Sequence, residues 1–151
     1  MRSSVFKIKF NKSAFELNDD YEYLSDIDKE KILDLEAESF FDYDEDDRYV
    51  CLVITSSIEM EKYVEVLNSN HINNEYFDLS NDILKFKINI KEELKDKIST
   101  LNSIKWSFFI DDLDEWIINN LDIDMVLDRI SEVGIGTLTE VEKQFLKYYK
   151  K

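Results

Sequence analysis

The stretch RYVCLVIT, from Arg48 to Thr55, decides the fold class of this chain. Its apolar residues follow one another without the polar alternation of a half-exposed strand, which is typical of a strand covered on both faces. A helix is indicated directly after it. Ser56 and Glu59 have the spacing of a capping box, and apolar residues then recur every three or four positions. The stretch therefore predicts a domain in which helices pack against a buried sheet.

The pattern continues outward in the order β-α-β-β-α-β, which is that of a ferredoxin-like split βαβ. The expected strands and helices cover 48–55, 57–68, 75–79, 83–90, 91–101 and 104–110. Residues 83–90 alternate apolar and polar side chains, and Asn89 with Glu92 forms a second capping box. We predict an α+β fold for residues 48–110, with strands 48–55, 83–90 and 104–110 in one sheet and both helices on the same face.

The segment before Arg48 is interpreted as one strand, one helix and two acidic loops. Val5–Phe10 alternates lysines with apolar residues and predicts a strand with one exposed face. Residues 11–24 are expected to form an acidic loop, and Ser25 to cap a helix that ends near Phe41. A second acidic loop is expected over Asp42–Asp47.

The C-terminal segment is predicted to be helical from Asp111 onward and to end in a helical hairpin. The chain has no proline and two glycines, Gly134 and Gly136, which lie close together near its end. Gly134 suits a helix end that needs a positive φ, and Thr139 with Glu142 forms a capping box for the next helix. These four residues are the expected structural elements of the hairpin.

Residues 126–146 read VLDRISEVGIGTLTEVEKQFL. This stretch resembles a short helical tail module of Bacteroidetes proteins, including tails on rhomboid-like membrane proteins, with a pattern near L-D-K-I-S-x-x-G-x-x-S-L-T-x-x-E-x-x-F-L. The chain matches that pattern at Leu127, Asp128, Ile130, Ser131, Gly134, Leu138, Thr139, Glu142, Phe145 and Leu146. A more distant similarity is to the bacterial helical modules named SHOCT domains. The resemblance implies a bacterial source and a hairpin for docking or oligomerisation, and it brings no catalytic residue. Residues 1–110 resemble no family.

Size and composition fit one compact domain. Hydrophobic residues make up 44% of the chain and aromatic residues 13%, which is enough for a packed core despite the charge. We expect an acidic α+β domain over 1–110 with a helical segment over 111–151 packed on it. No apolar run approaches the ~20 residues of a membrane span, and no signal peptide is indicated. Cys51 is the only cysteine, so no intrachain disulfide can form, which favours a reducing cytoplasm.

The formal net charge of −15 is unevenly distributed. Residues 16–47 hold fifteen acidic residues against two lysines, and residues 111–128 hold acidic residues without one basic residue. Such a field repels phosphate backbones and anionic membranes and attracts basic surfaces. We therefore expect a basic protein partner, no nucleic acid and no membrane. The candidate binding residues are Asp42, Asp44, Glu45, Asp46 and Asp47. The alternative is that the acidic residues only keep the protein soluble.

Motifs for catalysis, metal ions and cofactors give no positive signal. The acidic loop begins like a calcium loop, but Asp47 and Val53 stand where an EF-hand needs glycine and glutamate. With one histidine, His71, and one cysteine, Cys51, the chain cannot form a zinc site of the usual kind. We expect no catalytic residue, no metal ligand and no cofactor. Paired carboxylates for hydrolysis stay open as an alternative, because nothing in the sequence singles out two of the many acids.

Together these features predict a non-enzymatic, cytoplasmic, acidic binding protein of a bacterium. It would act like an immunity protein or inhibitor that covers a basic protein surface. A second hypothesis is a regulatory or structural module that forms a homodimer through the C-terminal hairpin. A third is a small carboxylate-dependent hydrolase, which requires two or three carboxylates to converge in one concave pocket.

Overall fold

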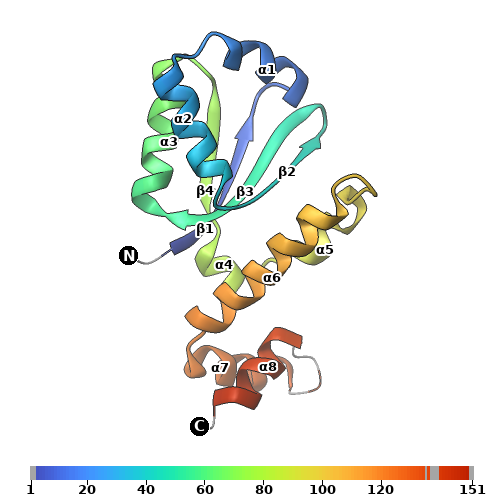
Figure 1. The fold of residues 1–151 in the computed structure, drawn as a ribbon. Helices are drawn as coiled ribbons and strands as arrows, with labels where there is room; N and C mark the ends of the chain where they lie inside the picture. The colour runs from blue at the N-terminus through green and yellow to red at the C-terminus, as the bar shows by residue number, and fades with distance from the viewer. Residues whose placement is uncertain (1–2, 135, 137–139, 150–151) are drawn as a thin grey trace.

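The computed structural model describes residues 3–134, 136 and 140–149, and in these residues the fold is α+β, as predicted. One antiparallel sheet contains β1 (Ser3–Phe10), β2 (Ser39–Glu45), β3 (Arg48–Ser56) and β4 (Asn74–Asp78). The helices are α1 (Ala14–Glu22), α2 (Asp26–Glu36), α3 (Ser57–Ser69), α4 (Ser80–Leu84), α5 (Ile90–Leu94), α6 (Ser103–Asn120), α7 (Ile123–Val133) and α8 (Glu140–Tyr149), with a 3-10 turn η1 (Lys95–Lys97). Helices lie on both sides of the sheet, and α7 and α8 lie at the end of the molecule farthest from α1 (Figure 1).

The strand order in the sheet is β2-β3-β1-β4, and each neighbouring pair is antiparallel. β1 and β2 are therefore parallel with β3 between them, and the chain joins them through α1 and α2. In the same way, β3 and β4 are parallel with β1 between them, and α3 joins them. Two split β-α-β units thus interleave within residues 3–78. The ferredoxin-like arrangement predicted for residues 48–110 is wrong, because only two of its four strands form.

α1, α2 and α3 cover one face of the sheet (Figure 1). β1 contributes every second residue to this face: Phe6, Ile8 and Phe10 are buried, whereas Lys7 and Lys9 alternate with them and are half-buried. The buried cluster here, named the α1–α3 cluster, contains Phe6, Ile8, Phe10, Leu17, Leu24, Ile32, Leu35, Phe40, Cys51, Val53, Met60, Tyr63, Val66, Leu67 and Ile72. The strand predicted over Val5–Phe10 is confirmed.

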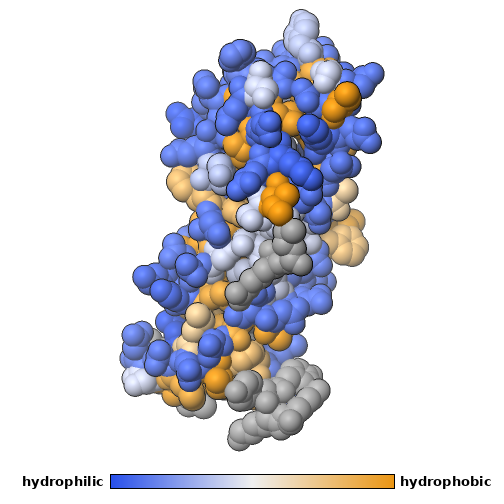
Figure 2. Space-filling model, turned by 90° about the vertical axis from the view of Figure 1, so that its left-hand side faces the viewer, coloured by the Kyte–Doolittle hydropathy of each residue, from blue (hydrophilic) through white to orange (hydrophobic). Residues whose placement is uncertain are grey.

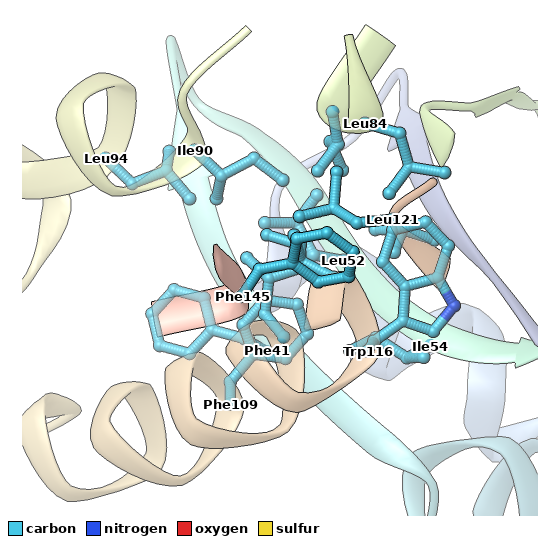
Figure 3. Close-up of a cluster of buried hydrophobic side chains, with 14 of the residues drawn as sticks. Phe41, Leu52, Ile54, Leu84, Ile90, Leu94, Phe109, Trp116, Leu121 and Phe145 are labelled. Carbon is cyan, nitrogen blue, oxygen red and sulfur yellow. The ribbon is translucent and has the colours of Figure 1, made fainter. Parts of the chain in front are cut away.

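The helices from α4 onward cover the other face, and α6 is the longest of them. Figure 3 shows Phe41 and Leu52 of the strands packed against Phe109 and Trp116 of α6, with Phe145 of α8 beside them. We name the buried cluster on this face, which includes Phe41, Leu52, Phe109, Trp116 and Phe145, the α6 cluster. α6 runs across the boundary predicted between residues 110 and 111. The predicted α+β domain and the helical segment therefore share one core.

The strand predicted over residues 83–90 does not exist. Its first residues belong to α4, a loop follows in which Phe86 has a φ of +57°, and Ile90 begins α5. Leu84 and Ile90 are nevertheless buried in the α6 cluster. The loop folds back onto the core, so alternating side chains are buried there although the backbone forms no strand. The helix predicted over 91–101 is shortened to α5 and η1.

The strand predicted over residues 104–110 is also wrong, because these residues form the first half of α6. The buried residues Phe109, Leu113 and Trp116 recur at helical spacing across residue 110. A helix that begins at Ser103 places all three side chains on its buried side. A change from strand to helix at residue 110 would separate Phe109 from Leu113 and Trp116 and would expose part of this series.

Two of the expected loops contain regular structure. Residues 11–24 include α1, which Ser13 and Glu16 cap reciprocally. The segment Asp42–Asp47 lies in β2 and in a two-residue hairpin turn, where Asp46 and Asp47 both have positive φ values of 53° and 59°. Both angles match the primed turns that join two antiparallel strands tightly. The acidic residues therefore belong to a strand and its turn.

Three predicted helix starts are confirmed by their capping bonds. The side-chain oxygens of Ser25, Ser56 and Asn89 each accept the backbone N–H three residues later, at 3.2, 3.2 and 3.3 Å. The helix that Ser25 starts is shorter than predicted, because α2 ends at Glu36 and Phe41 lies in β2.

The described part of the C-terminal hairpin fits the prediction for Gly134. This glycine ends α7 with a φ of 82° and a ψ of 155°, a conformation that is essentially restricted to glycine. Gly136 is exposed, and Thr139 lies outside the described residues. Glu142 is wholly buried, and its Oε1 lies 3.6 Å from Nε of Arg129. This ion pair, in which Glu142 is buried and Arg129 is 25% exposed, joins α7 to α8.

Candidate binding surface

A pocket of about 590 Å³ lies between α1, α2 and the β2 side of the sheet. We name it the α1–α2 pocket. It is lined by Ala14, Leu17, Asn18, Tyr21, Glu22, Leu24, Lys29, Ile32, Leu33, Glu36, Asp42 and Tyr49. Apolar side chains form most of the wall, and three carboxylates and the amine of Lys29 lie among them. A mostly apolar wall with a few polar groups is typical of a binding pocket.

The positions of these side chains follow from the helix and strand periods. Leu17 and Tyr21 are four residues apart on α1, and Ile32 and Glu36 are four apart on α2, so each pair lies on one side of its helix. On the strands, Asp42 has the opposite orientation to its buried neighbour Phe41, which belongs to the α6 cluster. Asp42 therefore faces α1 and α2.

Asp42 is held by two hydrogen bonds. The Tyr49 hydroxyl donates to Oδ2 at 2.7 Å, and Nζ of Lys105 donates to Oδ1 at 2.9 Å. Lys105 belongs to α6, so it reaches past the β2 edge to the other face of the sheet. Burial raises the pKa of Asp42, but the hydrogen bonds from Lys105 and Tyr49 outweigh that effect and hold the pKa below its usual value. Asp42 is therefore ionised at neutral pH.

Glu36 has the opposite shift. Partial burial raises the pKa of its carboxyl, the negative charge of Asp42 raises it further, and Lys105 opposes both effects. Neighbouring carboxylates that repel each other in a partly dry pocket favour the binding of a cation, since a cation relieves the repulsion. The two carboxylates therefore give this part of the pocket a negative charge, which Lys105 partly offsets at Asp42.

Cys51 and three tyrosines lie beneath or beside the pocket. Burial raises the pKa of Tyr21, Tyr49 and Tyr63, and it also raises the pKa of the Cys51 thiol, which is wholly buried on β3. A thiol whose pKa is raised is a poor nucleophile. His71, by contrast, is exposed just after α3. Cys51 therefore does not have the features of a reactive thiol, and His71 is not buried with it.

Exposed apolar side chains accompany the acids on the same two helices. Phe15, Tyr23, Ile27 and Leu33 are between 62% and 88% exposed. Figure 2 shows that most of the surface in its view is hydrophilic, with exposed apolar residues scattered over the upper part. Exposed aromatic and aliphatic groups set in an acidic surface are common at protein interfaces.

The structure separates the five acids singled out in the sequence. Asp42 lines the pocket, and Asp44 lies next to the start of α1, where its Oδ1 accepts the Ala14 N–H at 3.4 Å. Glu45 is paired in register with Arg48, while Asp46 and Asp47 form the hairpin turn. Only the first two therefore lie beside α1 and α2.

Sequence reasoning missed Glu22, Leu33 and Glu36 as pocket residues. All three come from helices, and one of these helices was read as a loop. The helical spacing of Ala14, Leu17 and Tyr21 was the signal that could have revealed α1.

A second pocket, of about 570 Å³, lies between the loop after α4 and the helices α6 and α7. Its charged groups are already paired: Nζ of Lys91 lies 2.9 Å from the Asp114 carboxylate, and the Arg129 guanidinium lies 5.4 Å from the Phe86 ring centre. The first contact joins α5 to α6, and the second holds α7 against the loop after α4, so we assign the pocket a structural role.

Within the described residues, no three acidic, histidine or cysteine side chains gather as a metal site would require. Over the same residues, no helix combines the length and the apolar character that crossing a membrane requires. Comparison of the chain with protein-family models, with curated proteins and with solved structures found no match.

Proposed function

We propose that this chain is an acidic binding protein that takes a basic, amphipathic segment of a partner protein into the α1–α2 pocket. In this proposal it acts like an immunity protein or inhibitor in the cytoplasm of a bacterium. One observation carries the proposal: an apolar pocket opens among Glu22, Glu36 and Asp42 on the most acidic part of the chain.

The two kinds of group in the pocket have separate roles. Leu33 is exposed and lines the pocket, so it offers an apolar contact to a partner side chain. Glu36 offers a carboxylate to a lysine or arginine, and binding of that cation would lower its raised pKa. The surrounding acids speed encounter with a basic partner through long-range attraction.

Selection of random peptides displayed against the immobilised full chain tests this proposal. Enriched peptides should combine lysine or arginine with an aromatic or aliphatic residue. Their affinity should fall steeply as salt rises from ~50 to ~500 mM, because exposed charges are screened beyond a Debye length.

Matched charge reversals locate the surface. Glu36→Lys should weaken peptide binding about tenfold or more, the loss of roughly one charge-assisted contact. Glu61→Lys makes the same change on the exposed side of α3 and should leave binding nearly intact. Equal weakening by both variants would mean that net charge alone governs binding and that the α1–α2 pocket is not the binding site.

Carboxylate-dependent hydrolysis is the second candidate function. The opposite pKa shifts of Glu36 and Asp42 within one pocket favour it, since such pairs divide acid and base roles. Both oxygens of Asp42 already accept hydrogen bonds, which limits its use as a base. A screen of glycoside and ester substrates tests this function: turnover abolished by Glu36→Gln would support it, and absence of turnover would exclude it for those substrates.

A further inference from the structure

Helix α6 has apolar residues on two sides. Its inner side packs into the α6 cluster, but Leu101, Ile104 and Phe108 are 98%, 72% and 69% exposed. Ile104 and Phe108 are four residues apart on the helix, and Leu101 lies just before its start, so the three are placed at one end of α6. We name these three residues the outer stripe. Single exposed apolar residues are ordinary, but three neighbouring large ones mark a contact surface.

The charge of the residues around the outer stripe changes sign along the chain, from basic before the stripe to acidic after it. The segment from Lys85 to Lys105 holds six lysines and three acidic residues. Lys91, Lys95 and Lys105 are paired with Asp114, Glu92 and Asp42, whereas Lys97 is exposed in η1 shortly before the stripe. On the other side, Asp111 and Glu115 follow Phe108 by three and seven residues, so they continue the same face of α6, and both are exposed. The order along this surface is basic, apolar, acidic.

We propose that the outer stripe is the contact surface of a homodimer in which two copies of α6 pack antiparallel across a two-fold axis. In this orientation the apolar residues of the two copies meet. The lysine end of each copy then faces the carboxylate end of the other. A partner of one charge sign would be repelled at one end, whereas a reversed copy of the same surface is complementary at both.

This proposal is independent of the proposed function. The α1–α2 pocket lies on the other face of the sheet, and it shares none of the three stripe residues. It also differs from dimerisation through the C-terminal hairpin, because α7 and α8 contribute no residue to the stripe.

Sedimentation velocity of the full chain over a wide concentration range tests the dimer. Ile104→Glu and Phe108→Glu should each raise the dimer dissociation constant at least ~10-fold, and circular dichroism should show both variants folded. Leu127→Glu is the matched control, since Leu127 is 51% exposed on α7. The control should dimerise like the unmodified chain.

Two results overturn the proposal. If the unmodified chain stays monomeric at its highest soluble concentration, the dimer is excluded. A different protein would then be the partner of the outer stripe. Alternatively, Leu127→Glu could dissociate the dimer while Phe108→Glu does not, which would assign self-association to the hairpin.

A charge swap tests the antiparallel orientation. Lys97→Glu and Glu115→Lys should each weaken the dimer several-fold, and the double variant should recover most of the loss because the charges again face opposite charges. Additive weakening in the double variant would overturn this orientation. Peptide binding in the α1–α2 pocket should be unchanged in Phe108→Glu, so failure of either proposal is recognised separately.

Discussion

The two faces of the sheet are both buried, yet they are built differently. On the α6 side, the aromatic rings of Phe41 and Trp106 pack edge to face with centroids 4.9 Å apart, and Phe109 adjoins both. On the α1–α3 side, the apolar cluster borders a pocket in which Asp42 is half-buried and Glu36 is exposed. Burial of polar groups costs free energy that apolar packing does not, so the α6 side contributes more to stability and the α1–α3 side carries the proposed binding pocket.

The largest expected effect tests whether the two faces unfold together. Phe109→Ala should destabilise the fold by about 3–5 kcal/mol, and Phe10→Ala on the opposite face should do the same, because each removes a buried ring. Both tryptophans, Trp106 and Trp116, lie in α6, so their fluorescence reports on one face. For Phe10→Ala, fluorescence and circular dichroism should lose signal at the same denaturant concentration. Separate midpoints would show that the faces unfold independently.

A smaller effect is expected at the ion pair of the C-terminal hairpin. Glu142→Gln should cost about 2 kcal/mol, because it removes a charge-assisted contact from a wholly buried site beside Arg129. Glu140→Gln on the same helix is the control, since its side chain is 92% exposed. Thermal unfolding should separate the two variants clearly. Indistinguishable melting curves would mean that the pair does not stabilise the α6 side.

Gly134 is expected to contribute through its backbone alone. A Cβ at this position would meet no atom within 4 Å, so Gly134→Val should cost about 1–2 kcal/mol from φ strain without a steric clash. Gly136→Val is the control, because Gly136 is equally open and its φ lies outside the left-handed range. Chemical denaturation of both variants measures the difference. A larger loss in the Gly136 variant would contradict this account of the helix end.

The smallest effect concerns Asp42, where the two faces are joined by Lys105. Asp42→Asn should cost about 1 kcal/mol at neutral pH, because both partners are partly exposed and the ion pair is screened. The pKa of Asp42 is lowered in the folded state, so its contribution is complete above the usual carboxyl pKa and is lost as pH falls through the lowered value. Denaturation at a series of acidic pH values should show a shallower decline for the variant. A parallel decline would show that other carboxylates dominate.

The sequence predicted the sheet's centre and the helix starts better than the C-terminal half. Val5–Phe10 and Arg48–Thr55 are strands because their patterns allow no amphipathic helix, and Ser25, Ser56 and Asn89 cap helices through local bonds. Residues 83–90 alternate like a strand, but they pack over a face of the sheet, where Leu84 and Ile90 are buried with the residues of α6. Their side chains reach the core from a short helix and a loop. Local pattern alone cannot reveal such a tertiary effect.

The candidate site was predicted only in part for the same reason. Asp42 was singled out by charge, but its partners come from distant parts of the chain: Glu36 from α2 and Lys105 from α6. Neither is recognisable among so many charged residues without the fold. The pocket itself depends on α1, which was read as a loop.

The contacts of α6 with β2 have a consequence for aggregation. β2 is an edge strand, and edge strands offer unpaired backbone groups to strands of other molecules. Two side-chain bonds from α6 reach this strand: Ser39 donates to Asp112 at 2.7 Å, and Lys105 donates to Asp42. An incoming strand would have to displace these contacts, while the other edge, β4, is five residues long and carries exposed Glu75 and Asp78. The β2 edge is thereby better protected from strand addition than the β4 edge, where Tyr76 and Phe77 are 42% and 40% exposed.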